Sequence, residues 1–276
     1  TLRRVVLDDE AGGRLHTVRE LVDALRDADS AGETHSTAET APDNWAHVLS
    51  GSHDDLDQYL KRKPVFEWVM WSFLRSVRGL WSLVAGFQVR DARQLPNKGA
   101  VIVCGNHASY LDPFLVCMSL PRRGLQRVFF VGYSEYFDGM VGRFLARLFR
   151  NIPIDANRNL QRAMQAAAEG LRRGMVLVIF PEGGRSLDGS VKEFRRGAAI
   201  LARNLDVPIT PVGIWGAHHV WPREGRIRRH PLVLSYGPTL SSGGSPSEEA
   251  FLGELRAEVI RLTDESSRAR DEASIN

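Results

Sequence analysis

The stretch that decides the fold is Gly99-Ala-Val-Ile-Val-Cys-Gly-Asn-His-Ala-Ser-Tyr-Leu-Asp-Pro113. Its first part, residues 100–104, is an unbroken apolar run with three β-branched residues, closed by Gly105, which predicts a buried strand that enters a tight turn. A helix is expected to start near Asp112, because Pro113 fits the first turn of a helix, where its missing N–H costs no hydrogen bond. The polar residues in between therefore lie at the carboxyl end of a strand, where an open α/β sheet places its reactive crevice.

Two of these polar residues, His107 and Asp112, are expected to face each other across the turn. A neutral imidazole takes up a proton near pH 7, and a carboxylate bonded to its other nitrogen fixes the tautomer and stabilises the imidazolium. The chain has no Gly-x-Ser-x-Gly turn, and neither Cys104 nor Cys117 has an obvious catalytic partner. The simplest interpretation is that His107 activates a hydroxyl of a substrate. The structural alternative is a capping box of Ser109 and Asp112, with His107 as an ordinary loop residue.

Four blocks, in order along the chain, resemble the glycerolphosphate and 1-acylglycerol-3-phosphate O-acyltransferase family, whose lysophosphatidate acyltransferases carry a His-x4-Asp motif. They are His107-Ala-Ser-Tyr-Leu-Asp112, Asn151-Ile-Pro-Ile-Asp-Ala-Asn-Arg158, Phe180-Pro-Glu-Gly-Gly-Arg-Ser186 and Val207-Pro-Ile-Thr-Pro-Val-Gly213. The resemblance extends over about residues 98–240 and does not include the first sixty residues. It implies an O-acyltransferase of phospholipid biosynthesis, with His107 and Asp112 as the catalytic residues.

The resemblance also indicates which residues bind the acceptor. Glu182, Gly183 and Arg185 belong to the third block, where glycine lets the backbone approach a ligand and the guanidinium fork suits phosphate oxygens. Glu182 is expected to bind a glycerol hydroxyl or to orient Arg185, and the alternative is a structural ion pair. In the related enzymes an arginine just after the second block's strand helps to hold the phosphate. Here Asp155 stands at that place, so Arg158 is the candidate for the role.

The implied substrates are a thioester donor and a phosphorylated acceptor. Acyl-coenzyme A and an acyl-carrier protein both remain open as donors, and no cofactor is expected beyond this co-substrate. The implied acceptor is a lysophospholipid, foremost 1-acylglycerol-3-phosphate, with another lysolipid or a glycolipid as the alternative. No metal site is predicted, because the pair His218-His219 has no compatible set of ligands beside it.

The alternation of strand and helix signals predicts an α/β fold with a mixed, largely parallel sheet flanked by helices. An acyltransferase domain is expected over residues 98–276. Asn151 to Asp155 is expected to be an edge or irregular strand, because Pro153 cannot donate to a ladder. Further strands are predicted at 128–131, 175–180, 207–214 and 232–236, and helices at 114–120, 142–150, 160–173 and about 247–263, followed by a frayed tail.

The first 97 residues divide into three expected segments. Residues 1–27 form a short helical segment that resembles the last helix of an acyl-carrier domain, or equally an unrelated amphipathic helix. Residues 28–60 are expected to be an acidic linker, and residues 61–97 an amphipathic helical region. Residues 1–60 contain 5 Lys/Arg against 13 Asp/Glu, whereas residues 61–240 contain 27 against 12. So basic a domain favours an anionic partner, such as phosphate or a lipid surface.

The amphipathic helical region, residues 61–97, contains the sequence features that predict membrane binding. Because Arg75 and Arg78 interrupt its apolar sequence, no uncharged run reaches the roughly 18–20 residues that cross a bilayer. We expect an interfacial helix on an anionic membrane surface, and the alternative is a helix packed on the core. Nucleic acid is not expected, because the aromatic residues gather in one apolar helix instead of alternating with basic residues. The aromatic residues are Phe66, Trp68, Trp71, Phe73, Trp81 and Phe87.

Cysteine usage indicates the compartment. Two cysteines cannot supply a disulfide framework, which favours a reducing compartment. The expected location is therefore the cytoplasmic face of the membrane, as a peripheral or monotopic protein. The chain starts at Thr1, which suggests a piece of a longer protein or a processed start. The rival from another class is a non-catalytic anionic-lipid-binding module, which leaves the pair His107 and Asp112 unexplained.

Overall fold

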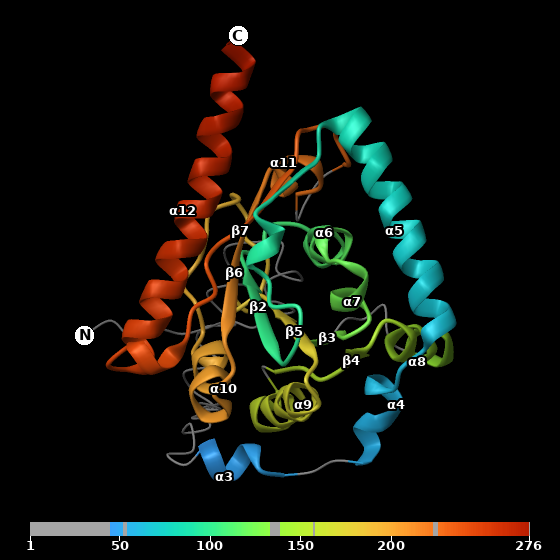
Figure 1. Ribbon diagram of the computed structural model, residues 1–276, viewed down its shortest axis with the longest axis vertical. Helices are drawn as coiled ribbons and strands as arrows, with labels where there is room; N and C mark the ends of the chain where they lie inside the picture. The colour runs from blue at the N-terminus through green and yellow to red at the C-terminus, as the bar shows by residue number, and fades with distance from the viewer. Residues whose placement is uncertain (1–44, 52–53, 133–138, 157, 223–225, 276) are drawn as a thin grey trace, which may run out of the picture. The chain divides into compact units, whose positions relative to one another are not determined.

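The computed structural model describes residues 45–51, 54–132, 139–156, 158–222 and 226–275 (Figure 1). The helical segment expected at residues 1–27 and the first part of the expected linker lie outside these residues. Within them the chain forms a seven-stranded sheet with helices on both faces, so the predicted α/β fold is confirmed.

The sheet has the strand order β1-β7-β6-β2-β5-β3-β4. All neighbouring pairs are parallel except β6 and β7, which are antiparallel, so the sheet is mixed and largely parallel as predicted. Its strands are β1 (Gln88–Arg90), β2 (Val101–Gly105), β3 (Val128–Val131), β4 (Asn151–Ile152), β5 (Val176–Ile179), β6 (Ile209–Trp215) and β7 (Val233–Tyr236). The short β4 is an edge strand, as Pro153 indicated.

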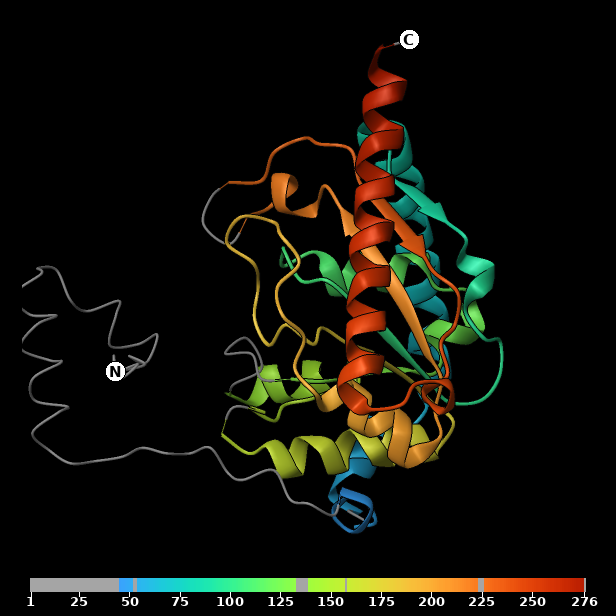
Figure 2. The same cartoon turned by 90° about the vertical axis from the view of Figure 1, so that its left-hand side faces the viewer.

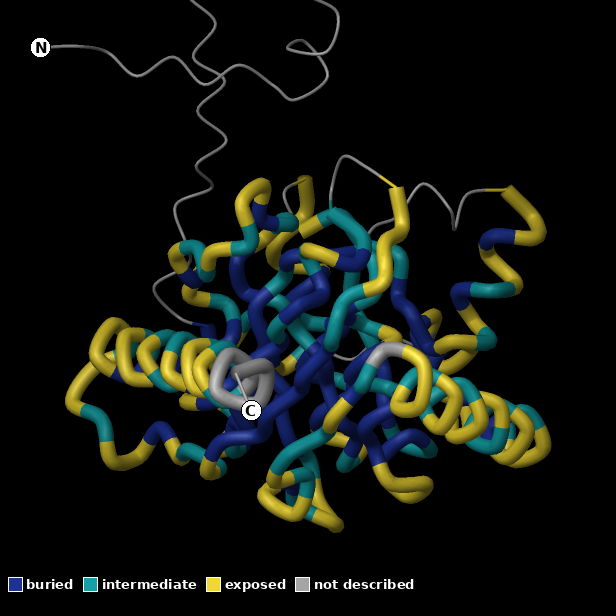
Figure 3. Tube along the Cα trace, turned by 90° about the horizontal axis from the view of Figure 1, so that it is seen from above, coloured by how far each residue is buried: buried dark blue, intermediate teal, exposed yellow. Residues whose placement is uncertain are grey.

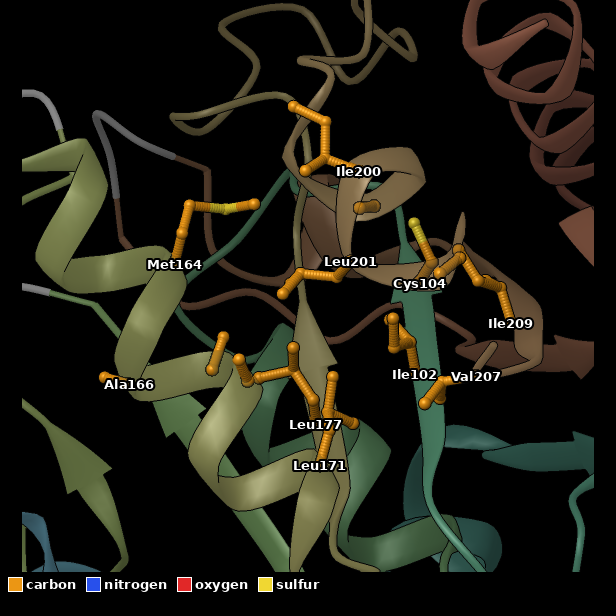
Figure 4. Close-up of a cluster of buried hydrophobic side chains, with 14 of the residues drawn as sticks. Ile102, Cys104, Met164, Ala166, Leu171, Leu177, Ile200, Leu201, Val207 and Ile209 are labelled. Carbon is orange, nitrogen blue, oxygen red and sulfur yellow. The ribbon is translucent and has the colours of Figure 1, made fainter. Parts of the chain in front are cut away.

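The apolar run of β2 is explained by burial on both faces. Val101 and Val103 point into one hydrophobic cluster, while Ile102 and Cys104 point into the other, and all four are fully buried. A strand covered on both faces has no polar side and so reads as a continuous apolar run. Figure 4 shows Ile102 and Cys104 among the side chains of their cluster.

Helices cover the two faces separately. The face of Ile102 and Cys104 is covered by α3 (Trp45–Leu49), α9 (Leu160–Arg172), α10 (Gly197–Leu205) and α12 (Glu248–Ile275), all with residues in the same cluster. The other face carries α5 (Pro64–Ala85), α6 (Asp112–Ser119), α7 (Arg122–Leu125) and α11 (Ala217–Val220). The short α4 (Asp57–Leu60) and α8 (Gly139–Leu148) lie near the end of the sheet formed by β3 and β4. Figure 2 shows α12 crossing one face, and Figure 3 shows the buried strands between helices with exposed outer sides.

Two expectations need correction. The linker expected over residues 28–60 does not continue to its predicted end, because Trp45, Leu49 and Leu60 are buried against the core from α3 and α4. The C-terminal helix does not fray after residue 263 but continues as α12 to Ile275. Its continuation is anchored by Ser266, whose buried hydroxyl lies 2.9 Å from that of Ser235 on β7.

The amphipathic helical region expected over residues 61–97 is helical as far as Ala85: α5 begins at Pro64 and is capped by Gly86 in the left-handed conformation. The region then continues into β1 instead of a helix. One side of α5 packs on the core through Leu74, with Trp71 and Trp81 partly buried beside it. The opposite side is exposed. No helix in the described ranges combines the length and apolar character needed to cross a membrane.

Candidate active site

The loop after β2 is pinned to the neighbouring strand by Asn106. This buried side chain donates its Nδ2 to the carbonyl of Ile214 on β6 at 3.0 Å and accepts the N–H of Ile214 at 2.8 Å. Ser109 adds a second attachment, since its hydroxyl donates to the carbonyl of Trp221 at 2.8 Å. The residues between them are thereby fixed at the carboxyl end of β2.

His107 and Asp112 lie together, as the sequence predicted. The Nδ1 atom of His107 is 2.8 Å from Oδ2 of Asp112, whose side chain is fully buried. The same carboxylate oxygen accepts the N–H groups of Ala108 and Ser109 at 2.7 and 2.8 Å. Because a carboxylate oxygen is an acceptor, this geometry fits the tautomer in which Nδ1 of His107 donates to Asp112 and Nε2 is left free to accept a proton.

The Phe180–Ser186 turn holds the same histidine from the other side. Glu182 accepts the backbone N–H of His107 with Oε1 at 2.8 Å, and the carbonyl of His107 accepts the N–H of Ser186 at 2.7 Å. The ring of Phe180 stacks on the imidazole with centroids 4.5 Å apart. Two loops that are 75 residues apart in sequence are thus joined at one residue.

Glu182 is a buried carboxyl group that is only half satisfied. Its Oε2 atom is buried and has no hydrogen-bond partner among the described residues. Burial raises the pKa of Glu182, and the backbone N–H groups of His107 and Lys192 oppose this shift without cancelling it. The described contacts of Glu182 are thus with the backbone N–H groups of His107 and Lys192, and no ion pair with Arg185 is found among the described residues.

Arg185 is supported by an aromatic ring. Its guanidinium carbon lies 3.4 Å from the ring centroid of Tyr110, which itself packs against Trp221 at 5.2 Å between centroids. The Nη1 atom of Arg185 is buried without a hydrogen-bond partner in the described part of the chain. A cation held over a π face keeps its in-plane N–H donors available for an anionic ligand.

Gly183 allows a second arginine to approach the turn. Gly183 has a φ of 71°, and a Cβ atom at this position would lie 2.3 Å from Cζ of Arg195. Lys192 is also close, since its Nζ lies 3.4 Å from the carbonyl oxygen of Arg185. The turn is therefore surrounded by three cationic side chains. Lys192 and Arg195 were not among the residues that we assigned from sequence, although both follow the third block within ten residues.

Arg158 is not brought to this cluster by any described contact. It follows the edge strand β4, which is separated from β2 by β5 and β3. Its side chain is 84% exposed and lies 3.5 Å from Asp155. The structure thus joins His107, Asp112, Glu182, Gly183 and Arg185, and leaves Arg158 at the surface.

The cysteines are unsuited to nucleophilic chemistry. Burial raises the pKa of the Cys104 thiol far above its ordinary value, and it raises that of Cys117 to about 12. Neither thiol is ionised near neutral pH, and the thiolate is the reactive form. In the described ranges, no group of three or more His, Cys, Asp or Glu residues is arranged to hold a metal ion.

The family model described as Acyltransferase matches residues 86–215. A 1-acyl-sn-glycerol-3-phosphate acyltransferase of Limnanthes douglasii is 30% identical over 170 residues, which cover 60% of this chain and 59% of that protein. The protein of the same description from Pseudomonas aeruginosa is 26% identical over 214 residues, 70% of this chain and 79% of the relative. The chain thus spans about three fifths of the length of the Limnanthes relative.

A solved structure supports the fold. The crystal structure of the 1-acyl-sn-glycerophosphate acyltransferase PlsC from Thermotoga maritima matches with a TM-score of 0.60 at 23% identity. The match covers 79% of this chain and 87% of that one.

Proposed function

From these similarities we propose that this chain belongs to the acyltransferase family and that it transfers a fatty acyl group from a thioester donor to a glycerol-phosphate hydroxyl. The donor is acyl-coenzyme A or an acyl-carrier protein, and the foremost acceptor is 1-acylglycerol-3-phosphate, the acceptor in the relatives' names. The observation that carries the proposal is the His107–Asp112 pair, 2.8 Å apart, tied by Glu182 to the turn that bears Arg185.

The proposed reaction is a direct transfer. Nε2 of His107 takes the proton of the acceptor hydroxyl, and the hydroxyl oxygen attacks the thioester carbonyl carbon. The tetrahedral intermediate then breaks its C–S bond, and the imidazolium of His107 returns the proton to the thiolate. The products are an ester and a free thiol, so the step balances without a further cofactor. Asp112 stabilises the imidazolium and holds the ring in place.

The acceptor phosphate is proposed to bind at the turn of residues 182–186. Arg185 offers N–H donors that no described residue uses at Nη1, and Lys192 and Arg195 add positive charge nearby. Charge-assisted hydrogen bonds of this kind are the strong ones. Arg158 keeps the role that the resemblance implies only as a secondary proposal, because its side chain is paired with Asp155 at the surface.

We also propose that the protein works at the cytoplasmic face of a membrane, since a lysophospholipid acceptor is a membrane lipid. The exposed apolar side of α5, with Trp68 and Phe73 more than half exposed, supports interfacial binding. Free cysteines support a reducing compartment.

The test is an assay with purified protein, either acyl donor, and a panel of acceptors that includes glycerol 3-phosphate, 1-acylglycerol-3-phosphate and other lysolipids. We expect thiol release that depends on a phosphorylated acceptor, with an equal amount of a diacyl product identified by mass. Binding of anionic lipid without thiol release from either donor would contradict the proposal and favour the non-catalytic module.

A further inference from the structure

Large apolar side chains gather on the outer surface of α5 and α8. Among the described residues, fifteen large hydrophobic side chains are exposed, and eleven of them belong to these two helices and to Phe149, which follows α8. Leu83 of α5 is 86% exposed and Met140 of α8 is 81% exposed. The eleven residues, which we call the α5–α8 face, are Val65, Trp68, Val69, Phe73, Leu80, Leu83, Val84, Met140, Val141, Phe144 and Phe149.

The two helices are fastened to each other near the N-terminus of α5. The ring of Phe66 meets that of Phe149 edge to face, with centroids 5.7 Å apart. At the next residue of each segment, the buried guanidinium of Arg150 forms an ion pair with the buried carboxylate of Glu67. Figure 1 shows α8 beside this end of α5. The exposed sides of α5 and α8 are thus held in a fixed relation.

The charges on the two helices are arranged for an anionic partner. Glu67 is the one acidic residue in the sequences of α5 and α8, and it is turned inward and 3% exposed. The arginines of these helices, Arg75 and Arg78 on α5 and Arg143 and Arg147 on α8, are all at least partly exposed. Their sequence positions intersperse positive charge with apolar side chains, and no exposed negative charge of these helices opposes them.

We propose that α8 is a second lipid-binding helix, so that the α5–α8 face binds an anionic bilayer with both helices in the headgroup region. This inference rests on the membrane location proposed above and adds the residues of α8 to it. Long arginine side chains direct their charge to the headgroups while Met140, Val141 and Phe144 enter the acyl boundary. Each arginine near an anionic surface contributes attraction that salt screens.

The test measures partitioning of the full chain to phosphatidylcholine vesicles with and without phosphatidylglycerol. Phe144→Glu is expected to weaken binding to the anionic vesicles at least about tenfold. Arg143→Gln is expected to weaken it roughly fivefold, and less so on neutral vesicles. The matched control is Ala257→Glu, which adds the same charge to an exposed position of α12 on the other face of the sheet, and it should bind as wild type does.

A second readout separates this inference from the proposed function. With a short-chain acceptor dissolved as monomers, Phe144→Glu should retain thiol release within about twofold of wild type, because the residue lies outside the site. Wild-type partitioning by Phe144→Glu, with binding lost in Trp68→Glu, would overturn the inference and leave α5 as the sole lipid-binding helix. It is equally overturned if the wild type ignores anionic vesicles and instead forms dimers that Phe144→Glu dissociates. Thermal midpoints of all variants verify folding.

Discussion

Two buried glutamates show how differently this protein treats its site and its scaffold. Glu67 is 3% exposed and Glu182 is 5% exposed. Both oxygens of Glu67 are engaged, by the N–H of Lys63 and by the guanidinium groups of Arg62 and Arg150. Burial opposes ionisation of Glu67, but these hydrogen bonds outweigh it and lower its pKa. Burial dominates at Glu182 and raises its pKa.

The difference lies in what each carboxyl group has left to bind. Glu67 is saturated and fastens α5 to the segment that follows α8, so its role is structural. Glu182 leaves one buried oxygen without a partner among the described residues, and Nη1 of Arg185 in the same turn is likewise buried without one. Unpaired buried polar atoms and perturbed pKa values are typical of functional sites. This contrast favours a functional role for the turn that contains Glu182 and a structural role for the ion pairs of Glu67.

The largest effect is expected from removing the proposed general base, His107, whose backbone N–H is accepted by Glu182. His107→Ala should lower kcat about 10²–10⁴-fold, the usual contribution of general-base catalysis. Thiol release under saturating substrates measures the loss. His47→Ala, which removes an imidazole on α3, should retain wild-type turnover. If His107→Ala retained it as well, the assignment of the base would be wrong.

Substitution of Glu67, in contrast, is expected to lower the stability of the protein and to leave its turnover unchanged. Glu67→Ala leaves the charge of Arg150 buried and unpaired, which should lower the free energy of unfolding by about 3–5 kcal/mol. The turnover of the folded fraction should remain near that of wild type. Urea denaturation measures the first quantity, with Glu265→Ala as a control for a surface ion pair, expected to cost about 0–1 kcal/mol. Equal costs for the two variants would refute the structural role of Glu67.

Substitution of Arg185 and of Arg158 tests which of the two arginines binds the acceptor phosphate. Arg185→Ala should reduce kcat/KM for the phosphorylated acceptor about 10–150-fold, the equivalent of a charge-assisted hydrogen bond. Arg158→Ala should reduce it less than about threefold, because a surface pair contributes little. Acceptor titrations of both variants decide between them. If Arg158→Ala lost more kcat/KM than Arg185→Ala, the phosphate-binding site would have to be assigned to the segment after β4.

The smallest effect is the pH dependence of stability. Because the pKa of Glu182 is raised on folding, its contribution favours the folded state below the unfolded pKa and is lost as pH rises through the folded value. Glu182→Gln should therefore raise the thermal midpoint at pH 7 relative to wild type, with a smaller difference at pH 4. For Glu67, whose pKa is lowered, Glu67→Gln should lower the midpoint at pH 7, with the difference shrinking in acid. Thermal scans at both pH values test these signs, and the same sign for both variants would contradict the contrast.

The fold was predictable where burial leaves a strong pattern. The runs at β2, β3 and β5 are apolar because helices cover both faces of the sheet. The edge strand β1 was missed, since Gln88–Arg90 is three residues long and mostly polar, and it exists through pairing with β7. The helices α3 and α4 were missed because their few buried residues lie in an acidic sequence that is typical of linkers.

The site was predictable where its contacts are local. His107 and Asp112 are five residues apart, so one turn brings them together. We did not assign Tyr110, Lys192 and Arg195 from sequence. Their positions depend on the contact between the loop that follows β2 and the turn that follows β5, which are far apart in sequence. Arg158 was assigned by resemblance alone. Its side chain is exposed because it follows the edge strand β4, and it lies near Asp155 there.

The central claim, direct transfer assisted by His107, is tested most directly by withholding the acceptor. Wild-type protein mixed with acyl-coenzyme A or acyl-carrier protein alone should release no thiol, and its intact mass should not increase. Addition of 1-acylglycerol-3-phosphate should then release one thiol for each diacyl product in the wild type, and almost none in His107→Ala. A thiol burst before the acceptor is added, accompanied by an acylated protein, would contradict the account.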